Sequence, residues 1–233
     1  MKSKKPIIEI KNVWKIYEIG TNKIFALRGM DLVINEGEFV AITGPSGSGK
    51  STAMNMVGAL DIPSKGKIFL EGEDISLMTE SDLAQIRGQK IGFVFQQFNL
   101  LNTLNALENV MLPMVFQGKT SEERKKRAEH LLSIVGLKDR MYNRPTELSG
   151  GQQQRVAMAR ALANDPDVIL ADEPTGNLDS KTGDTILDLL HTLHKKEKKT
   201  IIVVTHDDYV AKGAQRIARL KDGAIVSGGG TKK

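Results

Sequence analysis

The sequence contains no cysteine and no long apolar run, and each absence excludes a class of protein. Without cysteine, neither a disulfide framework nor a thiolate metal site can form. Because no run of about 18 apolar residues occurs, we expect no membrane-spanning helix. The basic residues 2–5 are not followed by an apolar segment, so they do not predict a secretory signal. These absences leave a cytosolic protein as the default expectation.

Length and composition are those of an ordinary globular protein. The 233 residues are 40% hydrophobic and 26% charged, which suits one large domain or two small ones. The net charge of +5 is compatible with phosphate ligands, an anionic membrane surface or nucleic acid, and does not choose among them. The basic runs at 124–127 and 195–199 lie beside glutamates, so we interpret them as solvated faces.

The most informative stretch is residues 44–51, which read G-P-S-G-S-G-K-S. It follows an apolar run at 38–43 that predicts a buried strand, and it precedes a helix predicted from Lys50 to about Leu60. Glycines let successive backbone N–H groups turn toward an anion, and the helix N-terminus adds partial positive charge. Lys50 supplies a full charge to the β- and γ-phosphates, and the Ser51 hydroxyl is a hard ligand for Mg²⁺. The pattern therefore predicts binding of nucleotide phosphates rather than a simple turn.

The segments around this loop predict an α/β protein. Apolar or alternating runs predict strands, and turn residues bound each of them. Thr79, with Asp82 three residues later, predicts the start of a short helix. The expected strands in this part of the chain span residues 7–10, 27–34, 38–43, 66–72 and 91–95.

Residues 98–160 lack any strand pattern and predict a helical insertion. Pro113 is expected to interrupt or bend the first helix, because proline lacks the amide donor of a helix interior. A capping box at 120–123 opens the second helix, and Gly136 is expected to close it. The expected helices span residues 105–117, 121–135 and 151–164.

Beyond the insertion the strand pattern returns. Near-continuous β-branched runs at 167–172 and 200–205 suit parallel strands buried on both faces. A helix over residues 180–196 is expected to connect them. The turn residues at 221–223 predict a hairpin, and the glycine-rich residues 228–233 predict a flexible tail.

Two adjacent carboxylates, Asp172 and Glu173, end the first of these strands. Ligand sites in open α/β sheets form at the carboxyl ends of strands. Asp172 is suited to hold Mg²⁺, directly or through water, and Glu173 to orient and deprotonate a water that attacks a γ-phosphate. Alone, such a pair often only ends a strand. Together with the phosphate loop, it indicates nucleotide hydrolysis.

A second glycine-containing turn, Leu148-Ser149-Gly150-Gly151-Gln152, precedes the helix expected from Gly151. It predicts a second helix N-terminus with bare backbone N–H groups facing an anion. One nucleotide does not need two such cradles from a single chain. The pattern therefore indicates that each cradle grips one side of a nucleotide shared across a dimer.

In chain order, these motifs resemble those of the ATP-binding subunits of ABC transporters, and the resemblance covers about residues 7–226. Residues 44–51 match the Walker A loop, with Thr52 following. Residues 148–152 match the signature sequence. Residues 168–173 match the Walker B strand with its catalytic glutamate.

Four further positions match the same family. Gln96 matches the Q-loop glutamine, which in the family contacts Mg²⁺ and senses the γ-phosphate. Residues 177–179 match the D-loop, which ends at Asp179. His206 matches the switch histidine, and Tyr17 matches the aromatic residue that stacks on adenine.

The resemblance implies a role for each of these residues. The implied catalytic residues are Lys50, Gln96, Glu173 and His206. The implied contacts with ATP in the same chain are Tyr17, Gly44, Pro45, Ser46, Gly47, Ser48, Gly49, Lys50, Ser51 and Thr52. The implied contacts with ATP bound to a partner copy are Leu148, Ser149, Gly150, Gly151, Gln152 and Asp179. The implied Mg²⁺ ligands are Ser51, Gln96 and Asp172.

The resemblance also implies the fold, a P-loop NTPase of RecA-like type within a single ATP-binding domain. A parallel-sheet core would carry an N-terminal antiparallel β subdomain and an inserted α-helical subdomain. The expected boundaries place the core and β subdomain at 7–96 and 165–227, and the helical subdomain at 97–164.

The implied function is ATP binding and hydrolysis that powers a transporter, with ATP and Mg²⁺ as cofactors. The chain would form a homodimer with ATP bound and associate peripherally with integral membrane permease subunits on the cytoplasmic face of the membrane. The apolar residues of 97–118 would form the contact, and no nucleic acid partner is expected. Runs at 91–100 and 148–155 resemble the lipoprotein-release and macrolide-export group.

Other classes of ATPase share these motifs but differ from this chain in other features of their sequences. ATPases of chromosome or repair machinery carry long coiled coils between Walker A and the signature, and this sequence has no sustained heptads there. Translation-associated ATPases carry two cassettes, and this chain has one. A subunit that drives a membrane partner mechanically in cell-envelope signalling has the same motifs, so that alternative stays open beside export.

Overall fold

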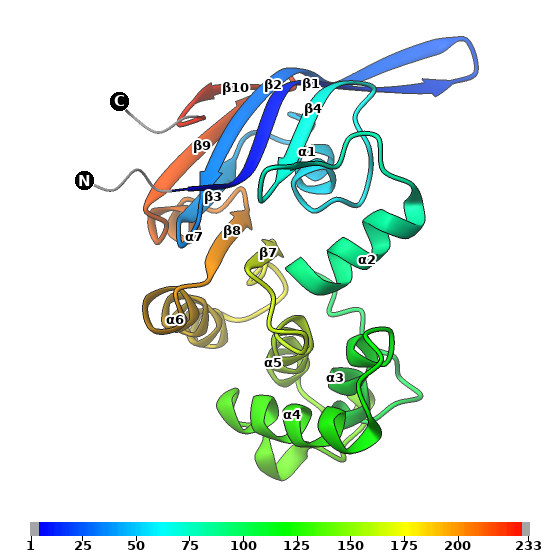
Figure 1. Ribbon diagram of the computed structural model, residues 1–233. Helices are drawn as coiled ribbons and strands as arrows, with labels where there is room; N and C mark the ends of the chain where they lie inside the picture. Colours follow the sequence, from blue (N-terminus) through cyan, green and yellow to red (C-terminus); the bar gives the residue numbers. More distant parts are fainter. Residues whose placement is uncertain (1–4, 230–233) are drawn as a thin grey trace. The chain divides into compact units, whose positions relative to one another are not determined.

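The computed structural model describes residues 5–229, which divide into two compact units (Figure 1). The first unit comprises the chain up to Arg87 and from Thr200 onward, and the second comprises Gly88–Lys199. The boundary falls within the helix α2 (Glu80–Lys90). Within the described range, no helix is both long and apolar enough to cross a membrane.

An antiparallel sheet forms one part of the first unit. Its strand order is β2-β1-β4-β5. In β2, Met30, Leu32 and Ile34 are fully buried at alternate positions, which puts one face of the strand into the core. The strands are β1 (Pro6–Ile19), β2 (Asn22–Asn35), β4 (Lys65–Leu70) and β5 (Glu73–Asp74).

Parallel strands form the other part of the first unit. The central strand β3 pairs in parallel with β8 and with β9, and β9 pairs antiparallel with β10. All five residues of β8 are buried, as the β-branched run predicts. The elements are β3 (Phe39–Thr43), α1 (Lys50–Val57), β8 (Thr200–Val204), α7 (Asp208–Lys212), β9 (Arg216–Lys221) and β10 (Ala224–Ser227).

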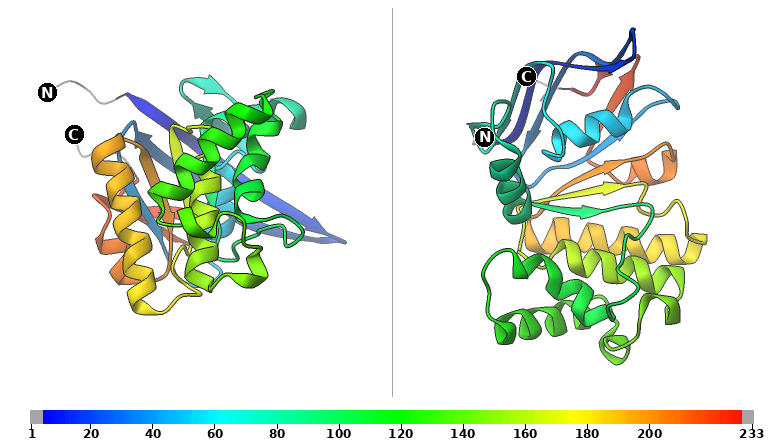
Figure 2. Two further views of the ribbon diagram at one scale, coloured as in Figure 1. Left: turned by 90° about the horizontal axis from the view of Figure 1, so that it is seen from below. Right: turned by 90° about the vertical axis from the view of Figure 1, so that its right-hand side faces the viewer.

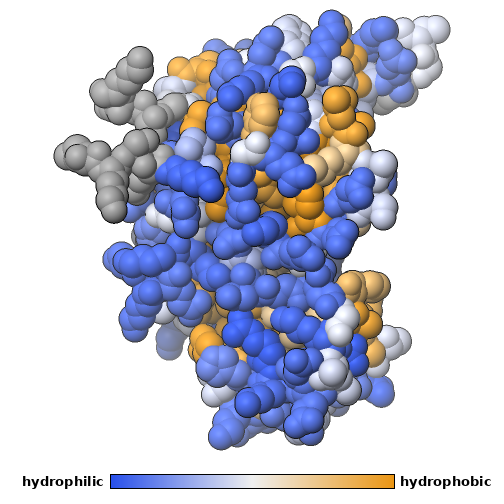
Figure 3. All heavy atoms as spheres, in the orientation of Figure 1, coloured by the Kyte–Doolittle hydropathy of each residue, from blue (hydrophilic) through white to orange (hydrophobic). Residues whose placement is uncertain are grey.

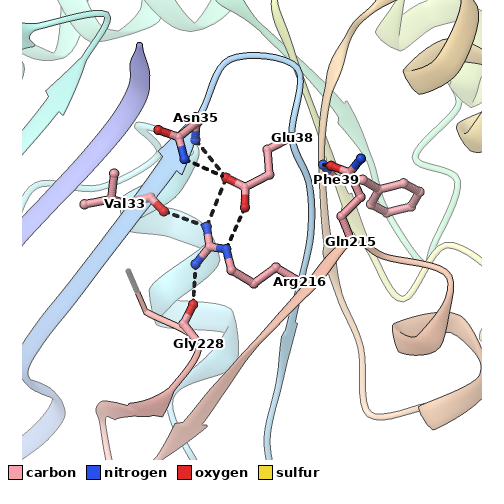
Figure 4. A network of polar contacts seen from close by, with 7 residues as sticks. All are labelled: Val33, Asn35, Glu38, Phe39, Gln215, Arg216 and Gly228. Carbon is pink, nitrogen blue, oxygen red and sulfur yellow. Dashed lines mark hydrogen bonds and ion pairs between the residues drawn. The ribbon is translucent and has the colours of Figure 1, made fainter. Parts of the chain in front are cut away.

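A buried ion pair joins these two parts of the first unit (Figure 4). The Arg216 guanidinium donates to both carboxylate oxygens of Glu38, at 2.6 and 3.1 Å, and to the carbonyls of Val33 and Gly228. Glu38 also accepts from the backbone and side-chain amides of Asn35, at 2.9 and 3.2 Å. The network therefore ties the end of β2 to the start of β9.

The second unit contains two parallel strands and four helices. Its strands β6 (Ile91–Val94) and β7 (Val168–Asp172) pair directly. The helices α3, α4 and α5 pack against one another, and they lie side by side in both views of Figure 2. The helices are α3 (Ala106–Val115), α4 (Ser121–Ile134), α5 (Gly150–Ala161) and α6 (Ser180–Glu197), with short 3₁₀ turns η1 (Lys138–Arg140) and η2 (Pro145–Glu147).

Side-chain caps start these helices where the sequence predicts them. Thr120 and Glu123 form the expected capping box of α4. Gly136, in a left-handed conformation with φ 69°, donates to the carbonyl of Ser133 and so closes the same helix. The expected interruption at Pro113 is absent, since α3 continues through it to Val115.

The two compact units separate near residues 87 and 199, and β6, β7 and α6 belong to the unit that contains α3, α4 and α5. One expectation about the C-terminal segment differs from the structure. Gly228 and Gly229, the start of the segment expected as a flexible tail, are hydrogen bonded to Arg216 and Val33. The rest of that segment, 230–233, lies outside the described residues.

Candidate active site

The phosphate loop leads directly into α1. Gly47 and Gly49 have positive φ angles of 74° and 100°, which glycine adopts without steric penalty. Gly49 is the N-cap, and no side chain caps α1. The first N–H groups of the helix are therefore left for a ligand, which is the arrangement that binds phosphate.

Neighbouring segments of the first unit hold this loop in shape. The Gly223 N–H donates to the Ser48 carbonyl at 3.0 Å, and the Arg28 N–H donates to the Gly223 carbonyl at 2.8 Å. A Cβ on Gly49 would lie 2.5 Å from the Ala26 carbonyl oxygen. Glycine at 49 is thus required both by the backbone angle and by the close approach of β2.

Lys50 and His206 line one cavity of about 700 Å³ in the first unit. The Lys50 ammonium donates to the carbonyls of Gly44 and Pro45, at 2.8 and 2.9 Å, which holds its charge over the loop. His206 is exposed and follows β8. The structure thus brings together two residues that are 156 positions apart in the sequence. The other lining residues are Thr43, Gly44, Pro45, Ser46, Asp208, Arg219, Leu220, Lys221 and Val226.

The cavity is also lined by two cationic residues, Arg219 and Lys221, that were not predicted as site residues from the sequence. Arg219 pairs with Thr43, so β9 delivers it to the carboxyl end of β3, beside the loop. No sequence signal marks them, because finding them requires knowing that β9 is the neighbour of β3. With Lys50 they make the cavity basic, which suits a polyphosphate.

Tyr17 lies on β1 and is not among the residues that line the cavity. Its hydroxyl lies 3.3 Å from a carboxylate oxygen of Asp61. The Lys15 ammonium bonds the same carboxylate at 2.6 Å and lies 5.2 Å from the centre of the Tyr17 ring. The ring is thus held by two charged neighbours.

In the second unit, the strand β7 ends at the two predicted carboxylates. Asp172 is the last residue of the strand, and Glu173 has a positive φ of 43°, which is uncommon for a residue other than glycine. The Gly176 N–H donates to the Glu173 carbonyl at 3.0 Å, so a tight turn follows at once.

Gln96 lies against this turn, within the second unit. The Asn177 side chain donates to the Gln96 carbonyl at 2.9 Å, and the Gln96 amide nitrogen lies 3.5 Å from the Asn177 side-chain oxygen. A Cβ on Gly176 would lie 2.9 Å from the same Gln96 nitrogen. The Q-loop and D-loop segments are therefore in direct contact.

One of the N–H groups expected to be bare at the N-terminus of α5, that of Gln152, is capped. Ser149 accepts from the Gln152 N–H, and the Gln152 side chain accepts from the Ser149 N–H, in a capping box. One backbone N–H group of the first turn of α5, that of Gln152, therefore already donates to the Ser149 hydroxyl. Ser149 is nevertheless exposed and Leu148 is buried, so the turn presents its serine to solvent.

Asp179 caps α6. It accepts from the Thr182 N–H at 3.0 Å and from the Thr182 hydroxyl at 2.7 Å, and these bonds lower the pKa of Asp179. A Cβ on Gly151 would lie 2.1 Å from the Thr182 methyl carbon. The start of α5 is thus pressed against the start of α6.

Comparison with known proteins decides the family. A family model described as ABC transporter matches residues 27–176. The chain belongs to the ABC transporter family. It is 57% identical over 221 residues to an uncharacterized ABC transporter ATP-binding protein of Thermotoga maritima, across 95% of this chain and 94% of that protein.

Two more relatives of this ABC protein are informative. It is 50% identical over 222 residues to the macrolide export ATP-binding/permease protein MacB of Wolinella succinogenes, across 95% of this chain but 34% of MacB. A solved dimeric structure of the ATP-binding cassette MJ0796, in a post-hydrolysis state with ADP and Pi, aligns with a TM-score of 0.87 and 51% identity. That alignment covers 94% of this chain and 97% of the cassette.

The ABC assignment fixes the fold and the general activity. The α/β P-loop NTPase fold with an N-terminal antiparallel sheet is confirmed. The chain is the ATP-binding, ATP-hydrolysing subunit of an ABC transporter.

The residues expected around Mg²⁺ in this ABC subunit are hard oxygen donors. The Ser51 side chain, in the first turn of α1, and Gln96 are exposed, and Asp172 is half-buried. Among the described residues no three His, Asp or Glu side chains gather into a metal site. Such donors fit a Mg²⁺ ion that takes few protein ligands and arrives with the phosphates.

Proposed function

We propose that the cavity beside the phosphate loop binds the triphosphate of ATP. The main support for this proposal is that the uncapped N-terminus of α1, Lys50 and His206 meet at one basic cavity. In this assignment Gly44–Thr52 hold the phosphates and Tyr17 stacks on adenine. The Lys50 ammonium leaves the two loop carbonyls for the β- and γ-phosphates.

We further propose that Glu173 is the general base for hydrolysis, with Gln96 and His206 contacting the γ-phosphate. The Glu173 carboxylate orients the attacking water and takes its proton. Ser51, Gln96 and Asp172 would hold Mg²⁺, and the ion would supply positive charge to balance the charge that develops on the phosphate oxygens. The strand-end position of Asp172 and the contact of Gln96 with the turn after Glu173 support these roles.

Two copies of the chain are proposed to act as a head-to-tail homodimer. Each ATP would be held by the phosphate loop of one copy and by residues 148–152 and Asp179 of the other. The dimeric MJ0796 cassette supports this, because it is bound to ADP and Pi in a post-hydrolysis state. The capping box leaves the Ser149 side chain exposed at the start of α5.

The work of hydrolysis is proposed to drive a membrane permease in export, from the cytoplasmic face of the membrane. The support is the MacB relative, which is named both ATP-binding and permease protein and of which this chain spans 34%. Leu101 and Phe116, in the segment expected to contact the permease, are 47% and 79% exposed. Figure 3 shows hydrophobic surface in separate patches among mainly hydrophilic residues. Co-purification from membranes would identify the permease.

The change Glu173→Gln tests the assigned base. We expect ATP turnover to fall about 100-fold or more, because the amide cannot accept the proton of the attacking water. ATP-driven dimerisation, followed by size-exclusion chromatography, should persist. The matched control is Glu122→Gln on the exposed surface of α4, which should retain turnover. Near-normal turnover in Glu173→Gln would reject Glu173 as the base.

A further inference from the structure

Gln154, in the second turn of α5, is completely buried in the second unit. Its side-chain amide donates to two main-chain carbonyls, that of Pro174 at 2.7 Å and that of Phe95 at 3.4 Å. Its side-chain oxygen makes no hydrogen bond with any part of the chain that the structure describes. The Gln154 side chain is therefore held by the two hydrogen bonds that its amide group donates.

The two carbonyls belong to the residues next to Gln96 and Glu173. Phe95 directly precedes Gln96, and Pro174 directly follows Glu173. Glu173 needs support of this kind, since a left-handed conformation at a residue other than glycine persists only where its surroundings impose it. One amide group thus fixes the backbone beside both residues.

A second side chain of α5 continues this contact. The Arg160 guanidinium donates to the carbonyls of Phe98 and Asn99, at 2.9 and 2.5 Å. Three of the five main-chain carbonyls of residues 95–99, those of Phe95, Phe98 and Asn99, therefore accept from the helix that begins at the signature turn.

We propose that Gln154 is a positioning residue for ATP hydrolysis, which holds Gln96 and Glu173 in a fixed relation to each other and to the signature helix. It acts through the backbone and does not touch the nucleotide. The inference rests on the proposed roles of Gln96 and Glu173. The chemistry requires an amide, because both partners are acceptors and an ionised glutamate of the same size would have no proton to donate.

The change Gln154→Met tests this role with a side chain of similar length and no donor. We expect kcat to fall about tenfold or more, since a small displacement of catalytic groups is sufficient for such a loss. The Kd for ATP should stay within about twofold of the parent, because the phosphate loop is untouched. The thermal midpoint should fall, because two main-chain carbonyls lose their donor, and removal of a buried acceptor without a partner offsets part of that loss.

The change Gln154→Glu gives a separate test that a purely structural role would not pass. Burial raises the pKa of such a carboxyl, and its protonated form regains one donor. The kcat of this variant relative to the parent should therefore rise as the pH is lowered from about 8.5 to about 6. Gln89→Met, which removes an exposed hydrogen bond to Gln117, is the matched control and should leave kcat unchanged.

The outcomes separate this inference from the proposed function. A Gln154→Met variant with kcat within twofold of the parent, or with ATP binding lost in parallel, would overturn it. If that variant does not fold, the pH dependence of Gln154→Glu decides: a rising ratio supports the role and a flat one contradicts it. If Glu173→Gln loses turnover while the Gln154 variants keep the kcat of the parent, only the positioning role of Gln154 is rejected. Normal turnover in Glu173→Gln would instead reject the proposed base.

Discussion

Glu38 shows how single charges stabilise the first unit. Burial would raise the pKa of Glu38, but the hydrogen bonds and charge of Arg216 and the bonds from Asn35 outweigh it, so the pKa lies below its usual range. The bidentate geometry with Arg216 joins two residues that are nearly 180 positions apart in the sequence (Figure 4).

The change Glu38→Gln should lower the free energy of unfolding by about 2 kcal/mol at neutral pH, because Arg216 loses its charged partner while remaining largely buried. In the parent, the folded pKa lies below the unfolded value of about 4.3. The contribution is therefore complete above about pH 5 and is lost as the pH falls through the folded pKa.

Denaturant unfolding at several pH values measures this difference. The gap between the parent and Glu38→Gln should narrow from about pH 6 to pH 3. The exposed neighbour Glu36 provides the control, and Glu36→Gln should match the parent throughout. A gap that stays constant with pH would show that ionisation of Glu38 does not contribute to stability.

At the scale of elements, regular patterns were predictable and interrupted ones were not. The strands β3, β7 and β8 and the helices α4 and α6 lie close to their predicted spans because their apolar period or their caps are unbroken. The hairpin of β1 and β2 was predicted only in part. Its pairing contains several register shifts between Pro6 and Ile16, and such bulges break the alternation that marks a strand.

The contact between α5 and α6 gives a prediction at this scale. The change Gly151→Ala would place a methyl group 2.1 Å from the Thr182 methyl carbon, so the two helix starts must separate. We expect the unfolding free energy to fall by about 2 kcal/mol, as is typical of overpacking.

A double variant isolates that clash. Thr182→Ser removes the methyl group but keeps the hydroxyl that donates to Asp179. In the Gly151→Ala background it should restore most of the lost stability, as measured by thermal unfolding. If Thr182→Ser alone destabilises as much as Gly151→Ala and the two losses add, the clash is not the cause.

At the scale of the whole molecule, local motifs were predictable from the sequence, and contacts between distant segments were not. The glycine loop and its helix predicted the cradle at Lys50, because that geometry is local. The cations Arg219 and Lys221 and the role of Gln154 depend on which strands and turns become neighbours. The cap formed by Ser149 and Gln152 has a local signature, but the glycines between them were read as an open cradle.

The most direct test of the shared nucleotide site uses mixed dimers. One copy carries Lys50→Ala, and the other carries Ser149→Asp, which can still cap α5 but sets a negative charge against the phosphates. Each variant alone should be inactive, and a shared site leaves one intact site in every mixed dimer. An equimolar mixture should then recover about a quarter of parent turnover, given random pairing of a symmetric dimer. A mixture as inactive as its components, with mixed dimers shown to form, would contradict the shared site.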